Sequence, residues 1–145
     1  MEITGLPLHP LVVHAAVVFG PLGALLALGY AGLPRWRDRL RWPMAGLVAV
    51  ATGAILAAYF TGKSFLNSRA AAIQASTFVQ AHQTHARQLL WVTLGFAIVV
   101  GVACWLHPRT GAVRVALNVA LGAFALGVLV LVVLTGDAGA RAVWG

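Results

Sequence analysis

The fold of this chain is decided by the stretch VALNVALGAFALGVLVLVVLT, residues 115–135. It contains no Lys, Arg, Asp or Glu, and it reaches the roughly 20 residues that an α-helix needs to cross a hydrocarbon core of about 30 Å. Three more runs without these charged residues occupy 11–33, 44–62 and 89–106. A helix is expected for each run, because an isolated strand cannot satisfy its backbone in lipid and the apolar residues do not alternate as they do in barrel strands.

The four runs predict an all-α, polytopic membrane protein whose four transmembrane helices form an up-down-up-down bundle. The expected helices are about 10–33, 44–62, 78–106 and 112–135. The composition agrees, since 61% of the 145 residues are hydrophobic and 9% are charged, whereas soluble domains carry roughly 25% charged residues. At this length we expect a single membrane domain, 1–145.

The net charge of +7 does not indicate a nucleic-acid-binding protein. The cations lie in the connections between the apolar runs, where the positive-inside rule places them. The connection 34–43 carries four Arg against one Asp, and the third connection holds His107, Arg109 and Arg114. The cations of the opposite side are Lys63, Arg69, Arg87 and Arg141. The bias predicts that the first and third connections are cytoplasmic and that both termini are extracytoplasmic.

The long second connection leads into a polar segment with a helical pattern. Phe78, His82 and His85 follow one another at spacings that place them on one helical face. Asn67-Ser68 can cap a helix that starts in this connection. We therefore expect the third helix to begin well before the membrane and to run straight into it.

Small residues recur every four positions on the second helix, at Ala45, Ala49, Gly53 and Ala57. Residues of this size at this spacing let helix backbones approach closely in lipid. The pattern predicts close helix packing through this face, either within the bundle or against a partner protein.

Four histidines lie toward one membrane face, because the first and third helices begin on the same side. His9 and His14 are at the start of the first helix, and His82 and His85 are near the start of the third. Ionisable groups at membrane depth are uncommon and indicate a functional site. His14 lies about one helical turn inside Pro10, and His85 lies about one turn beyond His82, so we expect the two at similar depth.

The expected bundle sets the distance across this histidine cluster. The first and third helices are diagonal partners, about 13 Å apart when neighbouring helices are 8–10 Å apart. This gap suits a flat macrocycle held by an imidazole from each side, so we expect haem b with His14 and His85 as axial ligands. His9 and His82 would flank the haem or hold a second site, and Arg87 would pair with a propionate.

Other functions remain open at this point. The same histidines would form a copper or zinc site if the first and third helices touched. Each histidine also fits an interfacial or capping role, and the chain would then be a cofactor-free accessory subunit of a larger membrane complex. An enzyme is not indicated, because the sequence has no nucleophile with a paired base, no phosphate-binding loop and no paired carboxylates.

The opening residues 5–14, GLPLHPLVVH, resemble the "HP-x-x-VH" start of a family of small bacterial membrane proteins, domain of unknown function 2231. The resemblance covers the whole chain. The Ala-Thr-Gly segment 51–53 is similar to part of the family's second helix, and His82 or His85 matches a histidine early in its third helix. The Gly-rich segment 136–140 is similar to the family's ending.

The resemblance implies a four-helix protein of the bacterial inner membrane. We expect this protein to act with other membrane subunits or with copies of itself. The resemblance also implies a respiratory, electron-transfer setting, because some relatives are fused to or encoded beside electron-transfer modules. The family usually has Phe-Pro after the second histidine, whereas this chain has Ala15-Ala16 and a later proline, Pro21. The first helix is therefore expected to kink at a different place from that in the family, and this affects the pose of His14.

Overall fold

Four long helices make up most of the described chain. The computed structural model describes residues 2–3, 6–67 and 77–144, and the side chains of residues 12–62, 77 and 79–140. Its helical elements are α1 (Leu8–Gly32), the 3-10 turn η1 (Pro34–Trp36), α2 (Arg37–Asn67), α4 (Thr77–Trp105) and α5 (Ala112–Trp144). Two short strands, β1 (Glu2–Ile3) and β2 (Leu6–Pro7), pair antiparallel ahead of α1.

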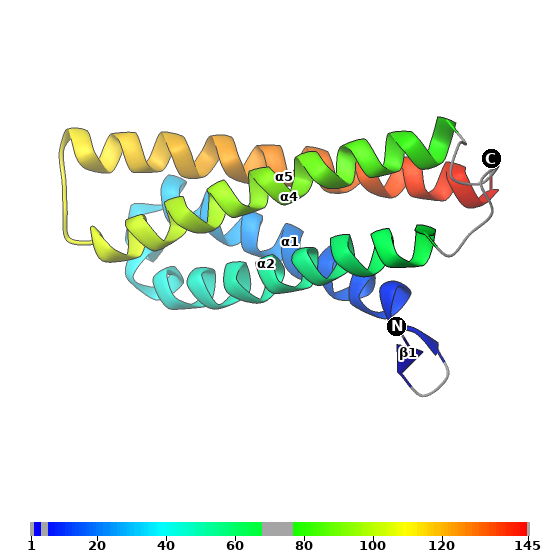
Figure 1. Ribbon diagram of the computed structural model, residues 1–145. Helices are drawn as coiled ribbons and strands as arrows, with labels where there is room; N and C mark the ends of the chain where they lie inside the picture. The colour runs from blue at the N-terminus through cyan, green and yellow to red at the C-terminus, as the bar shows by residue number, and fades with distance from the viewer. Residues whose placement is uncertain (1, 4–5, 68–76, 145) are drawn as a thin grey trace.

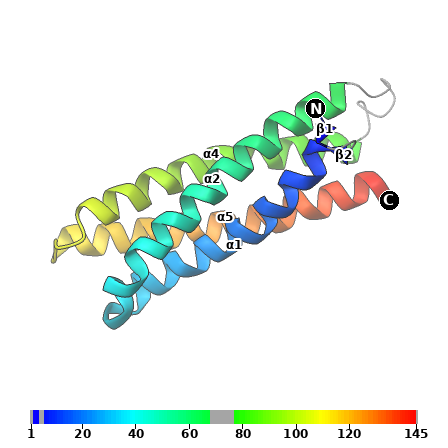
Figure 2. The same ribbon diagram turned by 90° about the horizontal axis from the view of Figure 1, so that it is seen from below.

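The helices run alternately up and down, and each packs against two neighbours. α1 packs on α2 and α5, and α4 packs on the same two helices, so α1 and α4 are diagonal partners. The α1–α2 and α4–α5 turns lie at one end of the bundle, and both termini lie at the other (Figure 1). Figure 2 shows the same pairing of antiparallel helices from below. The predicted up-down-up-down bundle is confirmed.

Four helical segments are long and apolar enough to cross a membrane, and the second of them includes η1 as well as most of α2. These segments are Val12–Gly32, Pro34–Gly62, Val79–Trp105 and Ala112–Ala140. Many of their large apolar side chains point outward, among them Val17, Leu25, Trp91, Ile98, Val119 and Val133. A helix that is apolar all round is buried either in a large core or in lipid. Four helices form no core large enough to cover these outer faces, so the faces fit a lipid bilayer.

Helix α2 is longer at its start than the predicted 44–62. It begins at Arg37, so most of the predicted connection 34–43 is helical, and Pro43 lies inside the helix. Long side chains such as those of arginine can lay their apolar stems along the bundle and keep the charged group at its end. Arg41, for example, donates a hydrogen bond from Nη2 to the carbonyl oxygen of Cys104 in α4.

Helix α5 is longer at its end than the predicted 112–135, since it continues to Trp144. The glycines of segment 136–140 do not stop it, and Gly139 instead lies against the His82 ring of α4. Helix α4 begins at Thr77, close to the predicted start at 78. The expected cap at Asn67-Ser68 and the polar segment that follows it lie outside the described residues from position 68 onward.

The small residues of α2 do not all face another helix of the chain. Ala49 and Gly53 are exposed, and a Cβ added at Gly53 would meet nothing within 4 Å. The close approaches within the bundle lie elsewhere. A Cβ added at Gly23 would lie 3.1 Å from the Val48 side chain, and one at Gly95 would lie 2.6 Å from the Phe124 ring. The small-residue face of α2 is therefore left for lipid or a partner.

Candidate functional site

The predicted site residues lie at the end of the bundle that holds both termini (Figure 1). His9 and His14 belong to the first turns of α1, and His82, His85 and Arg87 belong to the first turns of α4. The side chain of His9 lies outside the described residues. The structure thus brings the four histidines to one end of the molecule, on diagonal helices.

His82 is held against α5 by a hydrogen bond and by close packing. Its Nδ1 lies 2.9 Å from the carbonyl oxygen of Thr135. A carbonyl oxygen can only accept, so Nδ1 carries a proton, and in the neutral form of the ring the lone pair lies on Nε2. A Cβ at Gly139 would stand 3.0 Å from this Nδ1, so the glycine makes the room that the ring occupies.

His85 has the same arrangement of its ring nitrogens. Its Nδ1 lies 3.2 Å from Oε1 of Gln88, one turn further along α4. An amide oxygen accepts, so this Nδ1 also donates and Nε2 keeps the lone pair. Metal-binding histidines are commonly oriented in this way by a hydrogen bond from the second ring nitrogen. Arg87 is exposed on the same helix.

His14 is exposed on α1, and the packing register places it level with the start of α4. Gly20 of α1 lies opposite Val132 of α5. The two helices are antiparallel. His14, six residues before Gly20, therefore lies level with Ala138, six residues after Val132, and both are about 9 Å along the axis from that contact. That level is next to Gly139, which touches His82. His14 is therefore nearest in depth to His82, with His85 about one turn deeper.

The buried residues at this end of the bundle have small side chains. They are Ala16, Thr61 and Ala138, one from each of α1, α2 and α5. The largest fully buried side chains, such as Tyr30, Met44 and Leu121, lie elsewhere in the bundle. Among the described residues, no group of three or more His, Cys, Asp or Glu side chains lies close enough together to hold a metal ion.

A second polar cluster, which the sequence reasoning did not identify, occupies the opposite end. It centres on Tyr30, whose side chain is 0% exposed. The Tyr30 hydroxyl lies 2.7 Å from Nδ1 of His107, and Nε2 of His107 lies 2.6 Å from Oδ1 of Asp38. The chain of hydrogen bonds thus links α1, the α4–α5 turn and the first turn of α2. His107 does lie in a turn, as expected, but it connects three parts of the fold.

Two arginines complete this cluster by capping α4. Arg114 is only 6% exposed, and its Nη2 donates to the carbonyl oxygens of Leu106 and His107 at 3.2 and 2.7 Å. Its Nη1 donates to the Tyr30 hydroxyl at 3.3 Å. Arg41 reaches the carbonyl of Cys104. Cations at the carboxyl end of a helix satisfy its last carbonyls and oppose its dipole.

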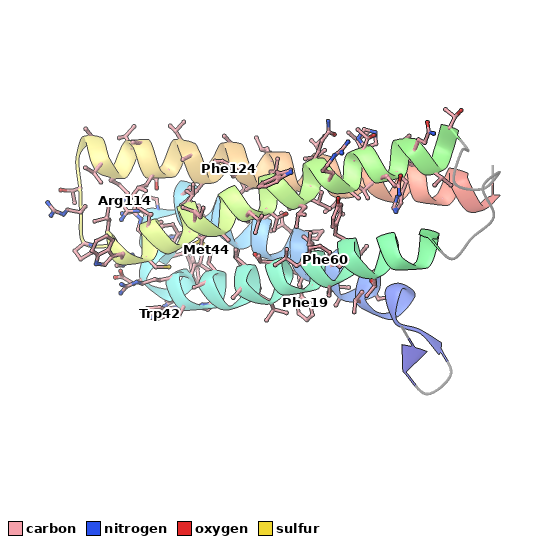
Figure 3. The ribbon with its side chains drawn as sticks, in the orientation of Figure 1. Phe19, Trp42, Met44, Phe60, Arg114 and Phe124 are labelled. Atoms are coloured by element: carbon pink, nitrogen blue, oxygen red, sulfur yellow. The ribbon has the colours of Figure 1, made fainter. Side chains whose placement is uncertain are left out.

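Figure 3 shows Arg114 beside the α4–α5 turn and Trp42 at the same end of the bundle. One sequence signal could have found the cluster. Arg114 stands only one residue before the uncharged run 115–135, at a depth where an unpaired charge is costly. The partner of Arg114 could not be predicted, because Tyr30 is distant in sequence and meets it only through the packing of α1 on α5.

Comparison with known proteins identifies the family of the chain. No curated protein and no solved structure matches it. A family model described as "Predicted membrane protein (DUF2231)" matches residues 5–145, which include all the described helices. The chain therefore belongs to this family of predicted membrane proteins, domain of unknown function 2231.

Proposed function

We propose that the histidine end binds b-type haem, with His14 of α1 and one histidine of α4 as axial ligands of the iron. The observation that carries the proposal is the hydrogen bond from Nδ1 of His82 to the carbonyl of Thr135, which leaves Nε2 available to a metal. Haem supplies one-electron redox chemistry when it is bound, so the chain would be a redox-linked membrane protein in a respiratory electron-transfer setting.

Three further features support a macrocycle at this end. α1 and α4 are diagonal partners, and with neighbouring helices 8–10 Å apart the diagonal is roughly 13 Å, a gap that fits a macrocycle better than a small ion. The small side chains of Ala16, Thr61 and Ala138 take up little of the interior between them. Arg87, exposed on α4, is available to a propionate. His14 is level with His82, whereas His85 lies deeper, so both α4 histidines are candidates for the second ligand.

The same proposal includes a location. We infer a bacterial inner membrane with both termini extracytoplasmic, because the α1–α2 and α4–α5 turns carry most of the cations. In this orientation the haem lies near the extracytoplasmic surface.

The test is a set of histidine variants purified after expression with a haem precursor. His14→Ala should remove the bound haem, measured as haem per polypeptide, and one of His82→Ala and His85→Ala should do the same. His107→Ala is the control, because His107 lies in the α4–α5 turn, beside Tyr30 and away from the histidine end. Haem content that is unchanged by all three substitutions at the histidine end would contradict the proposal. Loss of a small metal, with no pigment, would instead favour the copper or zinc site.

A second candidate function rests on the outer face of α2. Gly46, Ala49 and Gly53 are exposed on it, and Cβ atoms added at either glycine meet nothing within 4 Å. Exposed small residues allow another helix to approach closely, which fits an accessory subunit of a larger membrane complex. Gly53→Leu should then reduce the apparent mass of the solubilised assembly. Gly101→Leu, at an equally open position on α4, should not.

A further inference from the structure

A shallow pocket of about 310 Å³ lies where the chain passes from α1 into α2. Its lining residues are Arg35, Trp36 and Arg39, from η1 and the first turn of α2. The guanidinium carbon of Arg39 lies 5.4 Å from the centroid of the Trp36 ring, and that of Arg35 lies 6.0 Å from it. Two guanidinium groups, each with several hydrogen-bond donors, therefore lie beside the Trp36 indole at the edge of the pocket.

The positive charge of this pocket is not neutralised by the described part of the chain. The carboxylate nearest in sequence, Asp38, is already engaged, because its Oδ1 lies 2.6 Å from Nε2 of His107. Arg37, between the two lining arginines in sequence, has a buried Nε with no hydrogen-bond partner. Guanidinium groups bind phosphate and carboxylate through paired hydrogen bonds. The chemistry of the pocket thus fits a phosphate-bearing anion.

The position of the pocket indicates what carries the phosphate. Trp36, Trp42 and Trp105 are exposed at this end of the bundle, and exposed tryptophans gather at the headgroup level of a membrane. Leu33, just before the pocket, is 49% exposed and leads onto the apolar outer face of α1. A ligand at this place has its phosphate among arginines and an apolar surface for acyl chains directly beside it.

We propose that Arg35, Trp36 and Arg39 form a binding site for the headgroup phosphate of an anionic phospholipid. The two arginines bind the phosphate, and the indole packs against the glycerol region. The site lies at the opposite end of the bundle from the histidines, so it stands independently of any cofactor there. Its effect would be to fix the depth of the α1–α2 turn in the leaflet that it faces.

The test is lipid binding to the full chain in detergent, followed by native mass spectrometry. Phosphatidylglycerol is titrated against the unchanged chain and against Arg35→Gln and Arg39→Gln. Each substitution should weaken its affinity about fivefold, the usual effect of one basic residue near an anionic lipid surface. Both side chains are exposed, so the helix content by circular dichroism should not change.

Three comparisons make the test decisive. Arg109→Gln, an exposed arginine of the α4–α5 turn outside the pocket, should leave the affinity for phosphatidylglycerol unchanged. Zwitterionic phosphatidylcholine should bind weakly and equally to all variants, and inorganic phosphate at millimolar concentration should not displace phosphatidylglycerol. The proposal is overturned if Arg109→Gln weakens binding as much as the pocket variants do, if the pocket variants have no effect, or if inorganic phosphate competes.

Discussion

Tyr30 places one hydroxyl group where α1 meets the α4–α5 turn. The hydroxyl bonds to His107, accepts from Arg114, and lies 3.3 Å from the carbonyl oxygen of Ala103. Both protonation states of His107 are satisfied, because the hydroxyl can donate to Nδ1 or accept from it while donating to Ala103. Tyr30→Phe would leave buried groups without a partner, at a cost of about 1–3 kcal/mol in the free energy of unfolding.

The measurement for Tyr30 is thermal or denaturant unfolding in detergent. Tyr59→Phe is the matched control, because the Tyr59 hydroxyl makes no hydrogen bond with any described residue and its ring contact with Phe60 is kept. A loss of stability that is equal in the two variants would show that the Tyr30 cluster contributes nothing specific.

Gly139 makes a second prediction at the scale of a residue. A methyl group at this position would meet the His82 ring at 3.0–3.1 Å, so Gly139→Ala should push the ring away from Thr135. The lost hydrogen bond should cost about 1 kcal/mol. Gly136→Ala in the same helix is the control, since its methyl group meets nothing within 4 Å. A melting temperature of Gly139→Ala at or above that of Gly136→Ala would contradict the assigned position of His82.

The histidines themselves were visible in the sequence, but their surroundings were not. Spacing alone placed His82 and His85 near the start of one helix. The contacts of His82 with Thr135 and Gly139 depend on how far α5 continues, and the sequence analysis expected that helix to end at 135. In a membrane helix, neighbouring helices offset the low helix propensity of glycine and use its small size for packing.

At the scale of the element, α4 and α5 meet most closely where Gly95 faces Phe124, whose ring lies near the middle of α5 in Figure 3. A methyl group at Gly95 would stand 2.6 Å from the ring edge. Gly95→Ala should therefore destabilise the bundle by about 1–3 kcal/mol through overpacking. Gly101→Ala, on the same helix with nothing within 4 Å, should not destabilise it. Unfolding of the two variants in detergent, compared with the unchanged chain, checks this.

The existence of the helices could be predicted, while their ends could not. The membrane requires about 20 apolar residues per span and so fixes the middle of each helix. The start of α2 at Arg37 depends on tertiary contacts such as that of Arg41 with Cys104, and local sequence shows only arginines and prolines there. The turn before α5 is different, because its sequence does carry a local signal. Gly111 adopts a φ of +73°, a backbone conformation that favours glycine.

For the whole molecule, four spans place the two ends of the bundle on opposite sides of the membrane. In a Cys104→Ser background, Thr110→Cys near the α4–α5 turn and Gln83→Cys near the start of α4 are both exposed positions. A membrane-impermeant maleimide added to intact cells should label Gln83→Cys and should label Thr110→Cys only after the cells are opened. The reverse pattern would invert the orientation inferred from charge, and labelling of both from one side would contradict the four-span fold.

The central claim is that the histidine end holds haem, and the visible spectrum of the purified protein tests it most directly. The full chain is expressed with a haem precursor, purified in mild detergent, and recorded oxidised and then reduced. Two histidine ligands on diagonal helices predict a Soret band and a sharp α-band that appears on reduction. A colourless protein, prepared with haem supplied and with its helix content intact, would contradict the claim.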